Sequence, residues 1–120
     1  MTHQKRSVLE IPLFQKIYNL YQLIDLFTPD IPKAKRYTLW QLCEQEVLKL
    51  LKDLIGTSHQ MGDKRVQALL VMSQRVDLLK VFFRLCRDTK TLNEKNYLSL
   101  ESLLQEIGKM VGGWLKSVSR

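Results

Sequence analysis

Residues 66–87 read VQALLVMSQRVDLLKVFFRLCR, a stretch that is apolar on nearly every side when it is wound into a helix. One narrow polar row interrupts it, with members three or four residues apart that a helix stacks on one face: Ser73, Asp77, Lys80, Arg84 and Arg87. The last three members of this row are basic. So wide an apolar arc needs more than one neighbouring helix to cover it, and a basic row with few local acids favours an anionic partner.

Three more amphipathic stretches predict three more helices. The sequence predicts helices over residues 12–28, 33–56 and 64–89, and a fourth from Asn93 or Asn96 to residue 117. No stretch alternates for long enough to form a strand, so the predicted fold class is all-α, an up-down-up-down antiparallel four-helix bundle. We expect a single domain over residues 1–120, in which residues 1–11 are a flexible basic N-terminus.

Residues that commonly begin or end helices support these boundaries. Pro12 suits the first turn of a helix, whereas Pro29 and Pro32 cannot both lie inside one. Gly56 predicts a C-terminal cap for the second helix, and Asp63 predicts an N-terminal cap for the third.

Two features go beyond a plain bundle. In the third helix, residues 69–72 and 81–83 are consecutive apolar runs, which predict either contacts between subunits or a central position of this helix. In the fourth helix, Gly108, Gly112 and Gly113 either allow a neighbouring backbone to approach closely or loosen the helix before its end.

Composition and charge limit the function classes. The net charge of +7 and the isoelectric point of about 9.6 favour nucleic acid or an anionic surface as partner. Cys43 and Cys86 lie among apolar residues, which indicates buried thiols in a reducing compartment, or a disulfide if their helices pack side by side. The first residues lack a signal-peptide pattern and no apolar run could span a bilayer, so we expect a cytoplasmic protein without membrane contact.

The residues that could carry catalysis are few. His3 and His59 have no Cys, His or carboxylate partner at metal-ligand spacing, and Glu44 and Glu46 lie on different sides of the second helix. The serines have no neighbouring base to activate them, and the glycines do not form a phosphate-binding loop. We therefore expect no catalytic residue, no metal, no cofactor and no enzymatic activity.

The basic residues are the remaining functional signal. Residues 63–90 hold seven Lys or Arg against three Asp, a net charge of +4, and Lys33, Lys35 and Arg36 form a second cluster at the start of the second helix. Cations are disfavoured at a helix N-terminus, so a bound anion would stabilise this cluster. The predicted nucleic-acid contacts are Lys80, Arg84 and Arg87, supported by Arg75, Lys33, Lys35 and Arg36. The alternative is a solvated basic face. Since no base-reading motif is present, contacts would go to phosphate and shape.

Four segments together resemble a known family. They are FQKIYNLYQLI at residues 14–24, PKAKRYTLWQLCEQEVLKLL at 32–51, the long third helix, and GKMVGGWLKS at 108–117. This pattern resembles the four-helix-bundle family of Avd, the accessory variability determinant of diversity-generating retroelements, which also contains proteins encoded in intervening sequences of ribosomal RNA genes. The resemblance covers residues 12–118. Trp40 departs from it, because the family pattern leads us to expect glycine there.

The resemblance implies a non-enzymatic accessory protein that assembles as a homopentameric barrel. It implies a basic surface that binds template-repeat RNA, with DNA or an RNA–DNA hybrid as alternatives, and binding to the retroelement reverse transcriptase in support of mutagenic cDNA synthesis. The charge carried by the third helix favours the Avd branch. The alternative is an intervening-sequence-type bundle that acts as a structural or protein-interaction module of unassigned role.

Overall fold

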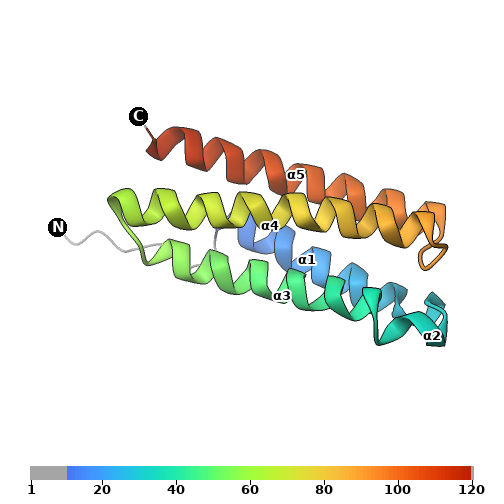
Figure 1. Cartoon of the computed structure of the whole chain (residues 1–120). Coiled ribbons are helices and arrows are strands. Elements are labelled where there is room, and N and C mark those ends of the chain that lie inside the picture. Colours follow the sequence, from blue (N-terminus) through green and yellow to red (C-terminus); the bar gives the residue numbers. More distant parts are fainter. Residues whose placement is uncertain (1–10, 120) are drawn as a thin grey trace.

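Four long helices make up most of the part of the chain that the computed structural model describes, residues 11–119 (Figure 1). The elements are α1 (Pro12–Phe27), η2 (Thr28–Asp30), α2 (Lys33–Arg36), α3 (Leu39–Ser58), α4 (Gly62–Asp88) and α5 (Glu94–Val118). The described residues contain no strand. The prediction of an all-α four-helix bundle is therefore confirmed. Of the N-terminus expected to be flexible, residues 1–11, only Ile11 lies in the described part, and it packs against the core.

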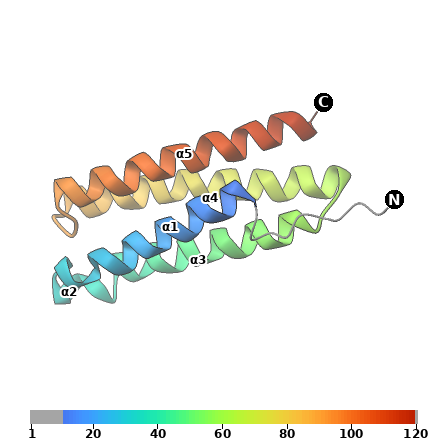
Figure 2. The ribbon, with the colours of Figure 1, turned by 180° about the vertical axis from the view of Figure 1, so that it is seen from behind.

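The four long helices form a closed square, because α1 and α4 each pack against both α3 and α5. Short connections reverse the chain between successive long helices, so the bundle is antiparallel (Figure 1, Figure 2). The bundle measures 55 × 25 × 21 Å. None of the described helices is both long and apolar enough to cross a membrane.

Each long helix buries residues spaced three or four apart, as the sequence predicts. Helix α1 buries Leu13, Ile17, Leu20, Ile24 and Phe27. Helix α4 buries Leu69, Met72, Val76, Leu79, Phe83 and Cys86. These rows meet the matching rows of α3 and α5 in one apolar core.

The predicted helix over residues 33–56 is wrong in one respect, because the chain breaks at residues 37–38 into α2 and α3. In a continuous helix, Arg36 would share a face with Trp40 and Cys43, both fully buried, and would place its guanidinium in the core. The break turns Arg36 outward. Its Nε donates to the Ile31 carbonyl oxygen at 3.0 Å, and its Nη2 donates to that of Pro29 at 3.1 Å.

Trp40, the residue that departs from the family pattern, is an anchor of the core. Its side chain is fully buried, and its indole Nε1 donates to the Thr28 hydroxyl oxygen at 3.0 Å. That hydroxyl in turn donates to the Ile24 carbonyl oxygen at 2.8 Å. Trp40 therefore ties the start of α3 to the end of α1.

The helix ends correct two predicted caps and confirm one. Helix α3 runs through Gly56 to Ser58, so the glycine is not its cap. Helix α4 begins at Gly62, whose φ of +59° favours glycine, and Asp63 lies in its first turn without capping it. Asn93 caps α5 as predicted, since its side-chain oxygen accepts from the Asn96 backbone N–H at 2.8 Å.

The glycines of α5 do not loosen the helix, which continues to Val118. At Gly108 a Cβ atom would lie 3.4 Å from Val76 Cγ1 of α4, so this glycine sits against the neighbouring helix. Gly112 and Gly113 face open space within one chain. Close approach therefore explains Gly108 alone.

Cys43 and Cys86 confirm the prediction of buried thiols. Both are fully buried and free, and their Sγ atoms lie 3.7 Å apart across α3 and α4. The hydrogen bond to Cys86, followed by burial, raises the pKa of the Cys43 thiol well above its usual range.

Candidate nucleic-acid interface

The basic row of α4 lies along its border with α5. Lys80 and Asp77 line a shallow cleft there, together with Gln105 and Lys109 of α5. One end of the row is at Arg87, whose guanidinium carbon lies 4.7 Å from the centre of the Tyr97 ring of α5. Because α4 is one unbroken helix from Gly62 to Asp88, the spacing of the row keeps its members on one face.

The three cations of the row differ in how far they are neutralised. Lys80 Nζ is 4.0 Å from Asp77 Oδ1, at the limit of an ion pair between exposed side chains. Arg87 Nε donates to Asp88 Oδ1 at 3.0 Å, and this hydrogen bond raises the pKa of Arg87. Arg84 is exposed and makes no ion pair with any residue of 11–119. Arg84 is therefore the member most available to a ligand.

The second cluster, on α2, lies at the same end of the bundle as Arg87. Lys35 Nζ donates to the Thr89 carbonyl oxygen at 3.4 Å, although 54 residues separate them. A cavity of about 370 Å³ has walls from Pro32 on one side and from Arg87 and Lys90 on the other. Both ribbon views place α2 beside the turn between α4 and α5 (Figure 1, Figure 2).

We call this region the basic end. Its cations are Lys33, Lys35, Arg36, Arg84, Arg87 and Lys90. Three carboxylates belong to the same segments, those of Asp30, Asp88 and Glu94, so six cations against three acids leave a net charge of +3. The two clusters that the sequence shows apart are thus one electrostatic surface in the fold.

Lys90 is a member of this surface that sequence analysis does not single out as a contact. It lies in the turn after α4 with a φ of 58°, in the left-handed region that few side chains adopt. The position of this turn beside α2 is the observation that places Lys90 in the basic end. Its basic charge alone gives no such signal.

Arg75 lies elsewhere, on the side of α4 that faces α3. Its Nη1 donates to Glu46 Oε2 at 2.7 Å, and its Nε donates to Asp53 Oδ2 at 2.6 Å. Burial alone would lower the pKa of Arg75, but the hydrogen bonds that its guanidinium donates to Asp53 and Glu46 outweigh burial and raise that pKa. Arg75 therefore bridges two helices, and the fold does not bring it to the other predicted contacts.

The helix α2 dipole cannot create an anion site, because α2 has only four residues. The predicted cost of cations at the start of a long helix does not apply, since α3 begins at Leu39. Lys33 is exposed at this short helix, while Lys35 and Arg36 bond to backbone carbonyl oxygens. Their charges still contribute to the basic end, since neither carbonyl bond neutralises a cation.

The outer side of α4 is an apolar stripe. Its members are exposed to between 38% and 55%: Leu70, Val71, Leu78, Val81 and Leu85. Their spacing of one, three, four or seven residues places them on one face. The structure therefore does not place α4 at the centre of the bundle, and the apolar excess of the third helix lies on the surface of the single chain.

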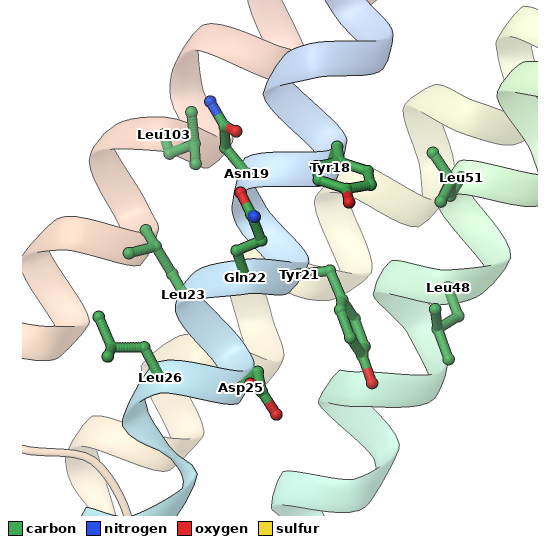
Figure 3. Close-up of a pocket in the computed structure, with 10 residues that line it drawn as sticks. All are labelled: Tyr18, Asn19, Tyr21, Gln22, Leu23, Asp25, Leu26, Leu48, Leu51 and Leu103. Carbon is green, nitrogen blue, oxygen red and sulfur yellow. The ribbon is translucent and has the colours of Figure 1, made fainter. Parts of the chain in front are cut away.

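A second apolar surface lies over α1, where an open groove has a volume of about 1020 Å³. Tyr18 and Tyr21 lie toward Leu48 and Leu51 of α3, and Leu103 of α5 lies on the other side (Figure 3). Among the described residues that line this groove, one is charged, and it is an aspartate, Asp25 of α1. The groove therefore suits an apolar protein surface better than a phosphate.

Metal-binding groups of three or more His, Cys, Asp or Glu side chains do not occur within residues 11–119. His59 is exposed at the end of α3, and His3 lies outside the described residues. Burial, followed by the charge of Asp25, raises the pKa of Glu44. Within the described residues, no hydrogen bond joins the carboxylate of Glu44 or Asp25 to a nucleophilic side chain or to a histidine.

Comparison with known proteins gives one match. A family model described as bAvd-like matches residues 12–118, almost the whole chain. No curated protein and no solved structure matches the chain.

Proposed function

The chain belongs to the bAvd-like family, and from this membership we propose that it is a non-enzymatic accessory protein of a diversity-generating retroelement. In this role it binds template-repeat RNA and the reverse transcriptase, and it supports mutagenic cDNA synthesis in the cytoplasm. Such a protein needs surfaces rather than a catalytic centre.

The basic end is the observation that carries the RNA-binding part of the proposal. Two cation clusters from distant parts of the sequence lie together there, and Arg84 is exposed without an ion pair among residues 11–119. Lys80 extends the same charge along α4. A surface of this kind attracts phosphates, so we expect salt-dependent binding with little sequence preference.

Two apolar surfaces support the proposed protein contacts. The stripe on α4 and the groove over α1 leave large hydrophobic side chains exposed in the single chain. We propose that these surfaces serve self-association, as the homopentamer that family resemblance implies, and binding of the reverse transcriptase. In a ring of five subunits the basic end would be repeated five times.

Charge reversal in the basic end tests the RNA-binding proposal. The variant Arg84→Glu with Arg87→Glu should abolish binding of a labelled single-stranded RNA while helix content and assembly stay unchanged. In a variant with only one of these two arginines reversed, the slope of log affinity against log salt concentration should become shallower by about 0.7–0.9 for each phosphate that is no longer bound. Fluorescence anisotropy at several salt concentrations measures both quantities.

The matched control is Lys52→Glu with Lys64→Glu, which makes the same change in net charge. Both lysines are exposed, and they lie on α3 and α4 away from the basic end. This control should bind RNA within about twofold of the native chain after correction for net charge. If the two double variants lose affinity equally, the basic end is not the contact.

The retroelement assignment has its own tests. A reverse transcriptase gene and a pair of near-identical repeats beside this gene would support it, and placement inside a ribosomal RNA gene would contradict it. Light scattering coupled to size exclusion should give the mass of five chains. A monomer at micromolar concentration would refute the proposed role of the α4 stripe.

A further inference from the structure

Tyr37, at the junction of α2 and α3, has an aromatic ring that the fold leaves uncovered. Its side chain is 78% exposed, and no other aromatic residue within 11–119 exceeds the 46% of Tyr18. Within the described residues, the Tyr37 side chain makes no hydrogen bond, ring pair or cation–π contact, whereas its backbone N–H donates to the Lys35 carbonyl oxygen. An aromatic ring normally contributes by burial, so a ring held in water is available to a partner.

The backbone on both sides of Tyr37 is held in place. Arg36 bonds to two carbonyl oxygens before α2, and Lys35 Nζ bonds to the Thr89 carbonyl oxygen beyond α4. On the other side, the Thr38 hydroxyl donates to the Lys35 carbonyl oxygen at 3.3 Å. The ring therefore projects from an ordered turn, which lowers the entropy cost when a ligand contacts it.

The surroundings of Tyr37 are cationic. Lys33, Lys35 and Arg36 precede it directly, and Lys35 connects this segment to the turn that holds Lys90. An exposed ring among cations that hold a phosphate backbone is the arrangement by which proteins bind single-stranded nucleic acids. The cations contact phosphates and the ring stacks on a base.

We propose that the ring of Tyr37 stacks on an unpaired base of a single-stranded nucleic acid whose phosphates lie on the basic end. This inference rests on the proposed function and adds to it the strandedness of the ligand. In a duplex the faces of the bases are covered by their neighbours, so the ring has no partner there. The site therefore selects unpaired segments over continuous duplex without reading sequence.

Three probes separate stacking from charge. They are a fluorescein-labelled oligouridine, an oligonucleotide of the same length and charge in which the central residues are abasic, and an RNA hairpin duplex. The native chain should bind the oligouridine more tightly than the abasic strand. Tyr37→Ala should weaken oligouridine binding by about tenfold, the usual size of one stacked base, and should leave the salt dependence unchanged.

Further variants isolate the ring. Tyr37→Phe keeps the aromatic face and should retain the native affinity. Tyr37→Trp should bind as well, and its indole fluorescence should be quenched by oligouridine and not by the abasic strand, relative to the native chain. Met61→Ala is the matched control, because it removes a large side chain that is 79% exposed in the turn before α4, at the opposite end of the bundle from Tyr37.

The outcomes distinguish this inference from the proposed function. If the native chain binds none of the three probes, the proposed function fails and the stacking site fails with it. If the native chain binds but Tyr37→Ala does not change the affinity, or weakens all three probes equally, stacking is refuted while RNA binding by the basic end stands. Circular dichroism of each variant shows that the bundle is intact, as expected for a side chain outside the core.

Discussion

Replacing Arg75 with alanine should destabilise the bundle and leave RNA binding unchanged. The guanidinium bridges Glu46 at 2.7 Å and Asp53 at 2.6 Å, and the three side chains are only 21%, 13% and 21% exposed. Removal of Arg75 leaves two largely buried carboxylates without their cation. Lys49 replaces little of this, because its Nζ lies 3.8 Å from Glu46 and is largely exposed.

The size of the destabilisation follows from these contacts. A hydrogen bond that involves a charged group contributes about 1.5–3 kcal/mol, and the remaining exposure allows water to replace part of each bond. We therefore expect the free energy of unfolding to fall by about 2–3 kcal/mol. With a urea dependence of about 1–3 kcal/mol per molar, the unfolding midpoint should fall by about 0.7–3 M.

The assay is urea unfolding followed by circular dichroism, at one protein concentration because association shifts apparent stability. Arg84→Ala is the comparison on the same helix. It should change stability by less than about 0.5 kcal/mol, since Arg84 is exposed, and it should weaken RNA binding. A destabilisation below about 1 kcal/mol for Arg75→Ala, or weaker RNA binding while the bundle stays folded, would refute this division of roles.

Two further predictions concern the turn after α4 and the acid beside α1. Lys90→Gly should raise the melting temperature, because Lys90 has a left-handed backbone conformation that costs a residue with a side chain about 1 kcal/mol. The same variant should bind RNA more weakly, because it removes one cation from the basic end. A lower melting temperature would contradict this account. Glu44 has a pKa raised above 4.5 by burial and then by Asp25, so the folded chain holds this proton more tightly and loses stability as pH rises above that value. In urea unfolding, Glu44→Gln should therefore be more stable than the native chain at pH 7 and equally stable at pH 3. Equal stability at both pH values would show that burial does not disfavour the charged carboxylate.

The helices and their buried rows could be predicted from the sequence, because apolar spacing is a local property of the chain. The residues that α1 buries recur every three or four positions, and Asn93 begins α5 by bonding to a backbone N–H three residues away. Neither feature depends on which helix packs alongside. The same locality explains why the basic row of α4 can be recognised without the fold.

The break between α2 and α3 is not predicted above, although the sequence contains a signal for it. Arg36 is in register with Trp40 and Cys43, so a continuous helix would bury a guanidinium. Arg75 carries a similar signal, since nine residues, about two and a half helical turns, separate it from Arg84 and place the two on opposite sides of α4. Helical geometry thus separates them, but it does not identify the partners that each meets.

Only the tertiary structure decided which cations lie together. The antiparallel path returns the end of α4 to the start of α2, and this joins Lys35 to the turn at Thr89 and makes two sequence clusters one surface. The same packing gives Arg75 two carboxylates from α3 and leaves Arg84 without an ion pair among the described residues. The sequence by itself determined the helices and the charge that they carry. Which charges are neutralised depends on contacts between distant segments, and these exist only once the helices have packed.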